Sequence, residues 1–284
     1  MSMSSMSSMS SMSSMSSMSS MSSNRISLYS RFSQESLPEF ESNDQSPFPN
    51  VNILDDIVIK KINDKEFMYQ KFFSEKVLSS LSSSSTVYNF PLVYNEDKKV
   101  FSMEKFDGDF ESFLREDVEI DEIISCYLQI IMALYVIDSY GKFHGDLNPG
   151  NILYKKIDYQ QEEEKKGYIK YMIGEDTYYV KHFNKLWVVA DFEYMGDKGE
   201  ELLKLNSSYD DNFFHRIFGD RYKDMKNPVK GSWLYDMYVI SHFSGASRMA
   251  DRVYNMIEEE WSMNPVESIY HIIKNDITDI FVKK

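Results

Sequence analysis

Cysteine is almost absent from this chain, which has 284 residues and a single cysteine, Cys126. One thiol cannot close an intrachain disulfide, so the sequence excludes a small secreted fold held together by disulfides. A chain without disulfides suits a reducing compartment, and we expect an intracellular, cytoplasmic protein.

Long basic and long apolar runs are missing as well. The formal net charge is -14 at pH 7, and no run of Lys or Arg is long enough to follow a phosphate backbone. We therefore expect no nucleic-acid partner. The longest apolar stretch, residues 127–137, is shorter than the ~20 residues that a membrane span needs. No basic segment precedes an apolar one at the N-terminus, and we expect no membrane association either.

The chain does contain enough hydrophobic residues, 42%, for one large domain or two lobes. Residues 1–23 repeat the triplet Met-Ser-Ser, whose period of three fits neither helix nor strand, and we expect a disordered tail. An expanded triplet tract with translation starting as late as Met21 explains this tail, and a serine-rich phosphorylation substrate is the alternative. Residues 24–50 contain three prolines and are expected to form an irregular segment.

Residues 51–106 have the patterns of a small, mostly β unit with one helix. Residues 64–81 carry apolar side chains at helical spacing, and Asp64 is expected to cap the start of that helix. β-branched and aromatic runs predict strands around the helix. The predicted strands cover residues 55–62, 86–95 and 98–106.

The second half is richer in helical patterns. Residues 120–138 are apolar at i, i+3, i+4 and i+7, which predicts a long buried helix that ends by Gly141 in a left-handed cap. Residues 168–183 alternate across Gly174 and predict a β-hairpin, and residues 185–194 indicate a buried strand running into an aspartate. Further helices are predicted at residues 232–243, 247–261 and 265–282.

Two short strings carry the chemistry of the chain. "FHGDLNPGN" at residues 143–151 places one histidine, one aspartate and two asparagines in a single loop, and "WVVADF" at residues 187–192 ends a buried strand on an aspartate. Their order and spacing resemble the catalytic core of the eukaryotic-type protein kinases. Gly145 and Asn148 are also similar to the aminoglycoside and choline kinase branch. The insertion and the Tyr-rich hairpin before residue 187 resemble protein kinase-like proteins of large DNA viruses.

The resemblance covers residues 57–245 and implies a fold. That fold is α+β and bilobal, with a reduced β-rich N-lobe at residues 51–106. A mainly helical C-lobe follows at residues 107–284, interrupted by an insertion at about residues 155–185. If the protein is viral, the resemblance places it in the host cytoplasm or the virion.

The resemblance also implies cofactors and roles. ATP and Mg²⁺ are the expected cofactors, since phosphoryl transfer depends on positioning and charge neutralisation. Asp146 is expected to be catalytic and to face the incoming hydroxyl. Asn151 and Asp191 are expected to hold Mg²⁺ between the phosphates, because magnesium prefers oxygen ligands. His144 is expected to be a satisfied structural histidine, and Asp236 to brace the catalytic loop.

Lys60 is the residue expected to hold the α- and β-phosphates. It lies in a predicted strand, and its neighbour Lys61 points to the opposite face. Its ion-pair partner is expected to be a glutamate on the following helix. Glu66 is only six residues away and Glu75 lies late in the helix, so the sequence leaves the choice between them open.

The segment around residues 103–106 falls where the hinge of a kinase lies. By resemblance, Met103 stands at the back of the nucleotide pocket. The backbone of Glu104 and Phe106 is expected to present a carbonyl and an N–H to adenine. Asp107 or Asp109 is expected to reach the ribose.

Several kinase features are missing. The first glycine of the chain is Gly108, so no glycine-rich loop precedes Lys60 to cover the phosphates. Glu193 stands in place of the usual glycine after Asp-Phe. Gly145 replaces an arginine that reads a phosphorylated activation segment, and Asn148 replaces a positively charged lysine. We therefore expect turnover slower than the ~1–100 s⁻¹ typical of kinases.

Three functions remain open from the sequence. The first is an ATP- and Mg²⁺-dependent serine/threonine protein kinase, whose partner is a protein substrate. The second is a pseudokinase, a nucleotide-binding interaction module that transfers nothing. The third is a small-molecule kinase of the aminoglycoside or choline kinase type. The sequence does not indicate the oligomeric state.

Overall fold

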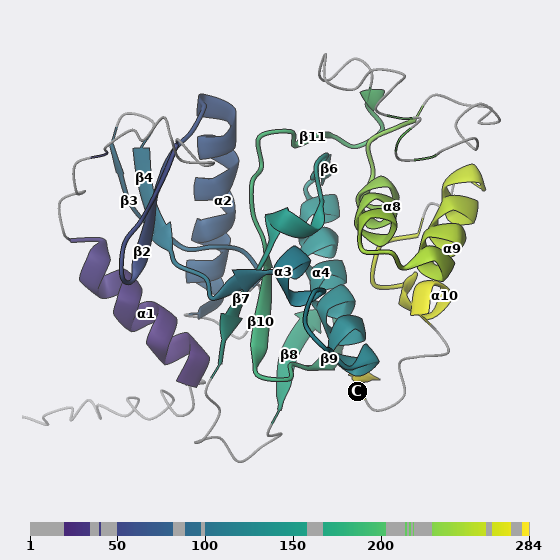
Figure 1. The fold of residues 1–284 in the computed structure, drawn as a ribbon, viewed down its shortest axis with the longest axis horizontal. Helices are drawn as coiled ribbons and strands as arrows, with labels where there is room; N and C mark the ends of the chain where they lie inside the picture. The colour runs from purple at the N-terminus through teal and green to yellow at the C-terminus, as the bar shows by residue number, and fades with distance from the viewer. Residues whose placement is uncertain are drawn as a thin grey trace, which may run out of the picture.

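The protein is a mixed α+β chain built from small antiparallel sheets and separate helices, which confirms the predicted α+β class. Figure 1 shows the N-terminal strands with two helices at one end of the molecule and the C-terminal helices at the other. The computed structural model describes residues 20–34, 40, 50–81, 89–97, 100–157, 167–202, 214, 216, 218, 229–259, 263–273 and 280–283.

The first sheet has four antiparallel strands in the order β1-β2-β4-β3. They are β1 (Val51–Ile53), β2 (Ile57–Lys61), β3 (Val93–Asp97) and β4 (Val100–Glu104). Ile57 and Ile59 are buried and alternate with more exposed neighbours, which is the period expected of a strand with one covered face. The three predicted strands of this region are therefore present, with the middle one starting no earlier than Val93 among the described residues.

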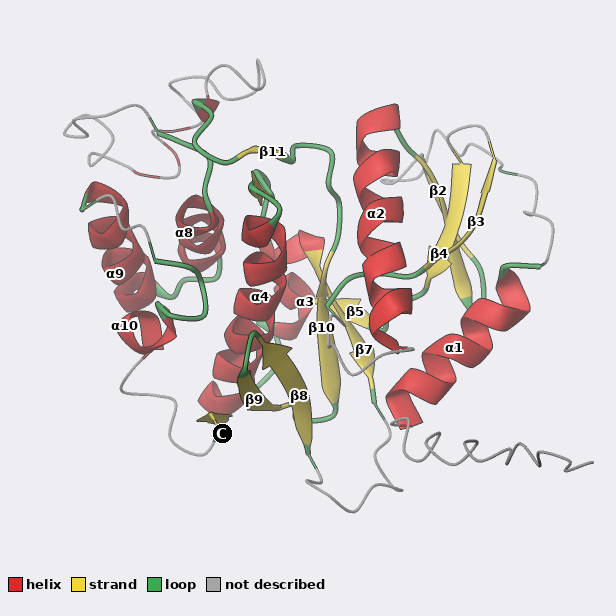
Figure 2. Cartoon of the chain, turned by 180° about the vertical axis from the view of Figure 1, so that it is seen from behind, coloured by secondary structure: helices red, strands yellow, loops and turns green. Residues whose placement is uncertain are grey.

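Helix α2 (Asp64–Leu81) follows β2 directly and lies beside the sheet in both views (Figures 1 and 2). The helix is where the sequence predicts it, but the predicted cap at Asp64 is wrong. The side-chain carbonyl of Asn63 accepts the N–H of Glu66 at 2.8 Å, so Asn63 caps the first turn.

The N-terminal segment differs from the prediction. Helix α1 covers Ser20–Phe32 and contacts β3 and α2, so the irregular segment expected from residue 24 and the disorder expected up to residue 23 are both wrong here. Two aromatic residues and an arginine of α1 pack against the sheet, which gives the helix a tertiary reason to form. Residues 1–19 of the predicted tail lie outside the described part.

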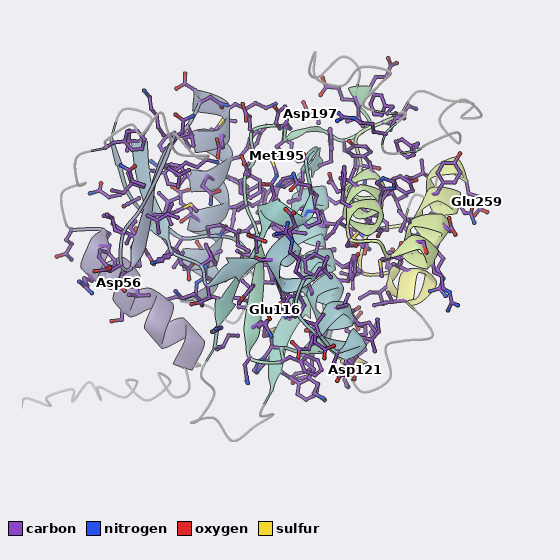
Figure 3. The ribbon with its side chains drawn as sticks, viewed as in Figure 1. Asp56, Glu116, Asp121, Met195, Asp197 and Glu259 are labelled. Atoms are coloured by element: carbon purple, nitrogen blue, oxygen red, sulfur yellow. The ribbon has the colours of Figure 1, made fainter. Side chains whose placement is uncertain are left out.

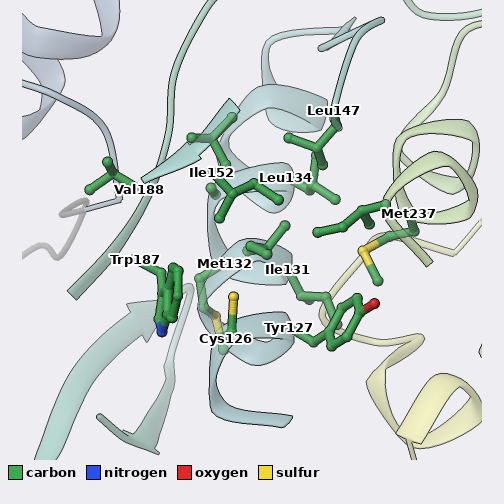
Figure 4. Packing of buried hydrophobic residues seen from close by; sticks show 14 of the residues in the cluster. Cys126, Tyr127, Ile131, Met132, Leu134, Leu147, Ile152, Trp187, Val188 and Met237 are labelled. Carbon is green, nitrogen blue, oxygen red and sulfur yellow. The ribbon is translucent and has the colours of Figure 1, made fainter. Parts of the chain in front are cut away.

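The centre of the molecule is organised around helix α4 (Ile120–Ser139), as predicted. Its end carries Gly141 at φ +66°, the left-handed conformation expected from the sequence. Figure 4 shows Tyr127, Ile131 and Leu134 of α4 packed with residues from neighbouring elements. Those neighbours are Leu147, Ile152, Trp187, Val188 and Met237.

Among the described helices, α4 alone is long and apolar enough to cross a membrane, by length and composition. The apolar stretch at residues 127–137 lies within this helix, which also includes residues 120–126 and 138–139. An 18-residue window of α4 is 67% buried inside the protein, as in the core helix of a folded domain.

A second sheet contains β7 (Ile152–Lys156), the strand that directly follows the loop at residues 144–151. Its strand order is β10-β7-β5, with β5 at Gly108–Asp109 and β10 at Lys185–Val189. Short helix α3 (Phe110–Phe113) follows β5, and the two-residue strands β6 (Lys142–Phe143) and β11 (Gly196–Asp197) pair with each other. The predicted buried strand before Asp191 is confirmed as β10.

The predicted hairpin is also present, as β8 (Tyr168–Ile173) and β9 (Asp176–Lys181). A third strand, β12 (Phe281–Lys283), pairs with β9, and the ring of Phe281 stacks on that of Tyr178 at 5.4 Å. The C-terminal strand therefore fastens the insertion to the rest of the molecule.

The C-terminal helices agree with the sequence in part. Helices α8 (Trp233–Phe243) and α9 (Ser247–Glu258) match their predictions. The helix predicted at residues 265–282 is wrong as a single element. Within the described residues it is helix α10 (Ile269–Ile273) followed by strand β12, because the last β-branched and aromatic residues complete the hairpin's sheet.

Candidate active site

The loop at residues 144–151 lies between β6 and β7 and is held from beneath by a buried carboxylate. Asp236 of α8 is fully buried and accepts the backbone N–H groups of His144 and Gly145, each at 2.8 Å. Burial raises the pKa of Asp236 to about 7, against the lowering effect of the two hydrogen bonds. The brace expected at Asp236 is therefore seen in the structure.

His144 has partners for both ring nitrogens. Its Nε2 lies 3.0 Å from the carbonyl of Ala190, and its Nδ1 accepts the N–H of Asp146 at 3.3 Å. This pattern fits a neutral ring with the proton on Nε2. Burial lowers the pKa of His144 to about 4, so the ring is neutral at pH 7. The prediction of a satisfied structural histidine is confirmed.

Asp146 and Asn151 of this loop are joined by hydrogen bonds. The Asn151 side-chain amide donates to the Asp146 carbonyl at 2.8 Å and to its carboxylate at 3.0 Å. Both hydrogen bonds come from the amide nitrogen of Asn151. The amide oxygen is an acceptor that these two bonds do not use. Asn148 accepts the N–H of Gly150 at 2.9 Å and so caps the short 3₁₀ helix Pro149–Asn151.

Asp191 is brought next to this loop by a backbone hydrogen bond. The Ala190 N–H donates to the Asn151 carbonyl at 3.0 Å, which joins the end of β10 to the start of β7. Asp191 has φ +69°, a left-handed backbone that is rare for a residue with a side chain. Backbone strain of this kind concentrates at functional sites.

Lys60 joins the N-terminal sheet to Asp191. Its Nζ lies 2.5 Å from Glu66 Oε1 and 3.3 Å from Asp191 Oδ1. Burial lowers the pKa of Lys60, but the carboxylates of Asp191 and Glu66 outweigh it and the pKa is raised, so the ammonium is charged at pH 7. The pairing left open by the sequence is made by Glu66. Because α2 begins only three residues after Lys61, the first turn of the helix faces back to the strand.

The carboxylates around Lys60 share one electrostatic environment. Burial and the charges of Asp191 and Glu193 together raise the pKa of Asp146 to about 6, against the opposing effect of hydrogen bonds from Asn148 and Asn151. Asp191 thus lies close enough to Asp146 for its charge to act on the Asp146 carboxyl group. A carboxylate with a pKa near 6 can accept a proton close to neutral pH.

Glu193, at a position where the resemblance leads us to expect glycine, has a partner of its own. Its Oε1 accepts the side-chain N–H of Asn63 at 3.1 Å, while the carbonyl of the same amide caps α2 at Glu66. Asn63 therefore connects the segment after Asp191 with the helix that carries Glu66. The sequence contains a signal for the helix cap, because Asn is a favoured capping residue, but no signal for the contact between Asn63 and Glu193.

Phe192 packs into a column of aromatic rings. Its ring centroid lies 5.1 Å from that of Phe73 on α2 and 5.3 Å from that of His144, and Phe73 stacks on Phe90 at 4.5 Å. Beyond Phe192 the chain continues through Met195 to Asp197 in β11, which Figure 3 labels. The column therefore links the residue after Asp191 to helix α2 and to the loop at residues 144–151.

The expected hinge residues lie at the end of β4 and directly after it. Met103 is buried and shares the Lys60 face of the sheet, because the strands pair Val58 with Met103 and Lys60 with Phe101. The Glu104 N–H donates to the Leu92 carbonyl at 3.0 Å, so of its two backbone groups the carbonyl remains the candidate for adenine.

The two aspartates considered for the ribose are engaged elsewhere. Asp107 accepts the N–H of Lys156 at 2.7 Å, and Asp109 accepts the N–H of Ser112 at 2.6 Å and caps α3. Their carboxylates hold the backbone of this segment, a role that the sequence argument missed. Phe106 packs against the apolar core from a partly buried position.

The residues proposed to hold magnesium have suitable chemistry. The Asp191 carboxylate, 37% exposed, and the Asn151 amide oxygen are both hard oxygen ligands. Among the described residues, no group of three or more His, Cys, Asp or Glu could hold a metal alone. This set therefore fits Mg²⁺ only together with oxygens from a phosphate ligand.

The sequence matches no protein-family model, and no curated protein is significantly similar to it. Functional assignment therefore depends on the residues of the site itself.

Proposed function

We propose that the protein is an ATP- and Mg²⁺-dependent phosphotransferase with a two-lobed, protein kinase-like fold, acting on serine or threonine hydroxyls of a protein. The observation that carries this proposal is Lys60, whose ammonium pairs with both Glu66 and Asp191 while Asp191 lies beside Asp146 and Asn151. One partly buried cation beside two carboxylates supports the binding of a triphosphate together with a metal ion.

Each residue has a defined task in this proposal. Lys60, held by Glu66, neutralises the α- and β-phosphates, and bound Mg²⁺ supplies further neutralisation of phosphate charge. Asp191 and Asn151 supply the protein oxygens for that ion. Asp146 orients the acceptor hydroxyl and takes its proton as the oxygen attacks the γ-phosphorus. The bond from that phosphorus to the bridging oxygen breaks, and ADP leaves with the electron pair.

Two features favour a second candidate, a nucleotide-binding module without transfer. No glycine precedes Gly108, and β1 and β2 are joined by only three residues, with the Leu54 N–H donating to the Ile57 carbonyl at 2.9 Å. Lys105, the residue after β4, donates through its Nζ to the carbonyls of Leu54 and Asp55. These hydrogen bonds connect the turn between β1 and β2 to the segment after β4. Such a turn leaves the γ-phosphate less covered than in a protein kinase.

Transfer of labelled phosphate decides between the two. The full chain is incubated with γ-labelled ATP and Mg²⁺, with its own serine-rich N-terminus and a generic protein as acceptors. Wild type should incorporate label, and Asp146→Asn and Asp191→Asn should each lose at least ~100-fold in rate, since a general base and a charge-neutralising group are each worth about that much. Asp197→Asn, an exposed aspartate paired with Lys142, is the matched control and should retain activity.

Binding of ATP without incorporation of label, in wild type as in Asp191→Asn, would replace the enzyme with the binding module. The small-molecule kinase is tested in the same assay with aminoglycoside and amino-alcohol acceptors in place of protein.

A further inference from the structure

Helix α1, which precedes the segment that resembles a kinase, inserts a buried arginine into the N-terminal sheet. Arg25 is 3% exposed, and its Nη2 donates to the Phe90 carbonyl and to Glu104 Oε2, each at 2.7 Å. Glu104 is 1% exposed, and the same oxygen accepts the N–H of Leu92 at 3.3 Å. One guanidinium therefore joins the end of β4 to the segment that enters β3.

Aromatic residues hold the same helix against the sheet. Phe32 is buried, and its ring centroid lies 5.4 Å from that of Tyr94, while the Tyr29 ring lies 6.3 Å from Tyr94. Figures 1 and 2 show α1 crossing the end of the four-stranded sheet in both views. The exposed face carries Arg31, which pairs at 3.3 Å with Asp56 where both side chains are more than half exposed.

The buried part of this contact is incompletely satisfied. Glu104 Oε1 and the Tyr94 hydroxyl are buried without a hydrogen-bond partner among the described residues. Burial, followed by the charge of Glu104, raises the pKa of Tyr94, so its hydroxyl is neutral. Burying charges and leaving polar atoms unpaired both cost free energy, which offsets much of the gain from the aromatic packing. The docking of α1 therefore contributes less net stability than its aromatic contacts alone would give.

Release would act on the strand end that leads to the expected adenine contacts. β4 ends at Glu104, and the chain from Glu104 to Phe106 is the segment proposed to meet adenine. With α1 docked, the Glu104 side chain is fixed from one side by Arg25 and from the other by the Leu92 N–H. With α1 released, Glu104 keeps a carboxylate that water can solvate, and the strand end loses its fixed partner.

We propose that Arg25 is a positioning residue for nucleotide binding. Docked α1 fixes the backbone at Glu104 through Arg25, and release of α1 weakens the affinity for ATP without changing the chemical step. This inference rests on the proposed function, because it assigns a regulatory element to the same nucleotide site.

The test uses three variants of the full chain. Arg25→Met removes the buried donor, and Arg25→Lys keeps a charge and a donor but on a shorter side chain. The double variant Arg25→Met with Glu104→Gln removes both charges and so protects against misfolding caused by an unpaired buried carboxylate. Arg31→Met on the exposed face of the same helix is the matched control.

Four quantities are measured: binding of a fluorescent ATP analogue with Mg²⁺, the KM for ATP, kcat, and hydrogen exchange of residues 89–93 and 104–106. Arg25→Met and the double variant should weaken nucleotide binding and raise KM by about tenfold, within the range of typical coupling between sites, with kcat within about twofold. Exchange in both segments should rise. Arg25→Lys should lie between wild type and Arg25→Met, and Arg31→Met should match wild type.

Unchanged exchange in folded Arg25→Met or in the double variant would overturn the docking. Raised exchange with unchanged nucleotide affinity would overturn the positioning role, as would a loss confined to kcat. If wild type binds no nucleotide, the proposed function fails and the link to affinity fails with it, while the exchange data still decide whether Arg25 docks α1.

Discussion

At the scale of single residues, Gly145 shows why the loop departs from the protein kinase pattern. Its φ is +88°, and a Cβ placed there would lie 2.4 Å from the carbonyl oxygen of Tyr194. No side chain fits this position, so the arginine found in many kinases is excluded by backbone geometry. Glycine is required at position 145 because the segment that follows Asp191 approaches its backbone closely.

Substitution of Gly145 should therefore cost more than substitution of another left-handed glycine. Gly145→Ala is expected to lower the free energy of unfolding by about 3 kcal/mol or more, because left-handed strain adds to a backbone clash. Gly141→Ala, at φ +66° with open space around the Cβ, is the matched control and should lose only about 1 kcal/mol. Urea unfolding of both variants measures the difference, and equal losses would refute the steric explanation.

The raised pKa of Asp146 gives the proposed reaction a pH dependence. As a proton acceptor, Asp146 works only when it is ionised, and its pKa of about 6 means that acid removes the active form. The rate of phosphate transfer should be level above pH 7 and fall about tenfold per pH unit well below pH 6. Initial rates between pH 5 and pH 8 at ATP concentrations well below the KM measure this, because kcat/KM reports the pKa values of the free protein. A rate that stays constant down to pH 5 would show that Asp146 is not the base.

At the scale of elements, the start of α2 connects three parts of the site. Asn63 caps the helix through its carbonyl and contacts Glu193 through its amide, so helix position and the segment after Asp191 depend on one side chain. Glu193 thus takes up a contact that the glycine of protein kinases could not make. The segment after Asp191 is expected to change conformation less readily for that reason.

Two substitutions separate the tasks of Asn63. Asn63→Ala should lower the free energy of unfolding by about 1 kcal/mol, the usual value of a helix cap. Asn63→Asp keeps an acceptor for the Glu66 N–H but cannot donate to Glu193. It should retain most of that stability while hydrogen exchange of residues 192–195 rises. If Asn63→Asp leaves this exchange at the wild-type rate, Asn63 does not hold Glu193.

At the scale of the whole molecule, strong local patterns were sufficient for the central elements. The apolar periodicity of α4, the alternation of the hairpin around Gly174 and the buried run of β10 predict their elements within a few residues. These elements depend on residues close together in sequence, where pattern is informative. The resemblance, and no local pattern, predicted that the loop at residues 144–151 meets Asp191.

Other contacts between residues far apart in sequence could not be predicted from local sequence pattern. Helix α1 has no apolar stripe in its Met-Ser-Ser start, and its docking depends on Arg25 meeting Glu104, 79 residues away. Strand β12 has three residues and forms because strand β9 pairs with it, with Phe281 opposite Val180. The choice of Glu66 over Glu75 required the position at which α2 begins.

Calorimetric titration of the full chain with ATP tests most directly whether Lys60, Asp146, Asn151 and Asp191 form one nucleotide site. The site predicts binding that requires Mg²⁺ and that weakens at least about tenfold in Asp191→Asn, since a charged metal ligand is lost. Asp197→Asn should bind as wild type does. Binding of equal strength in Asp191→Asn and wild type, or no binding in the presence of Mg²⁺, would contradict the account.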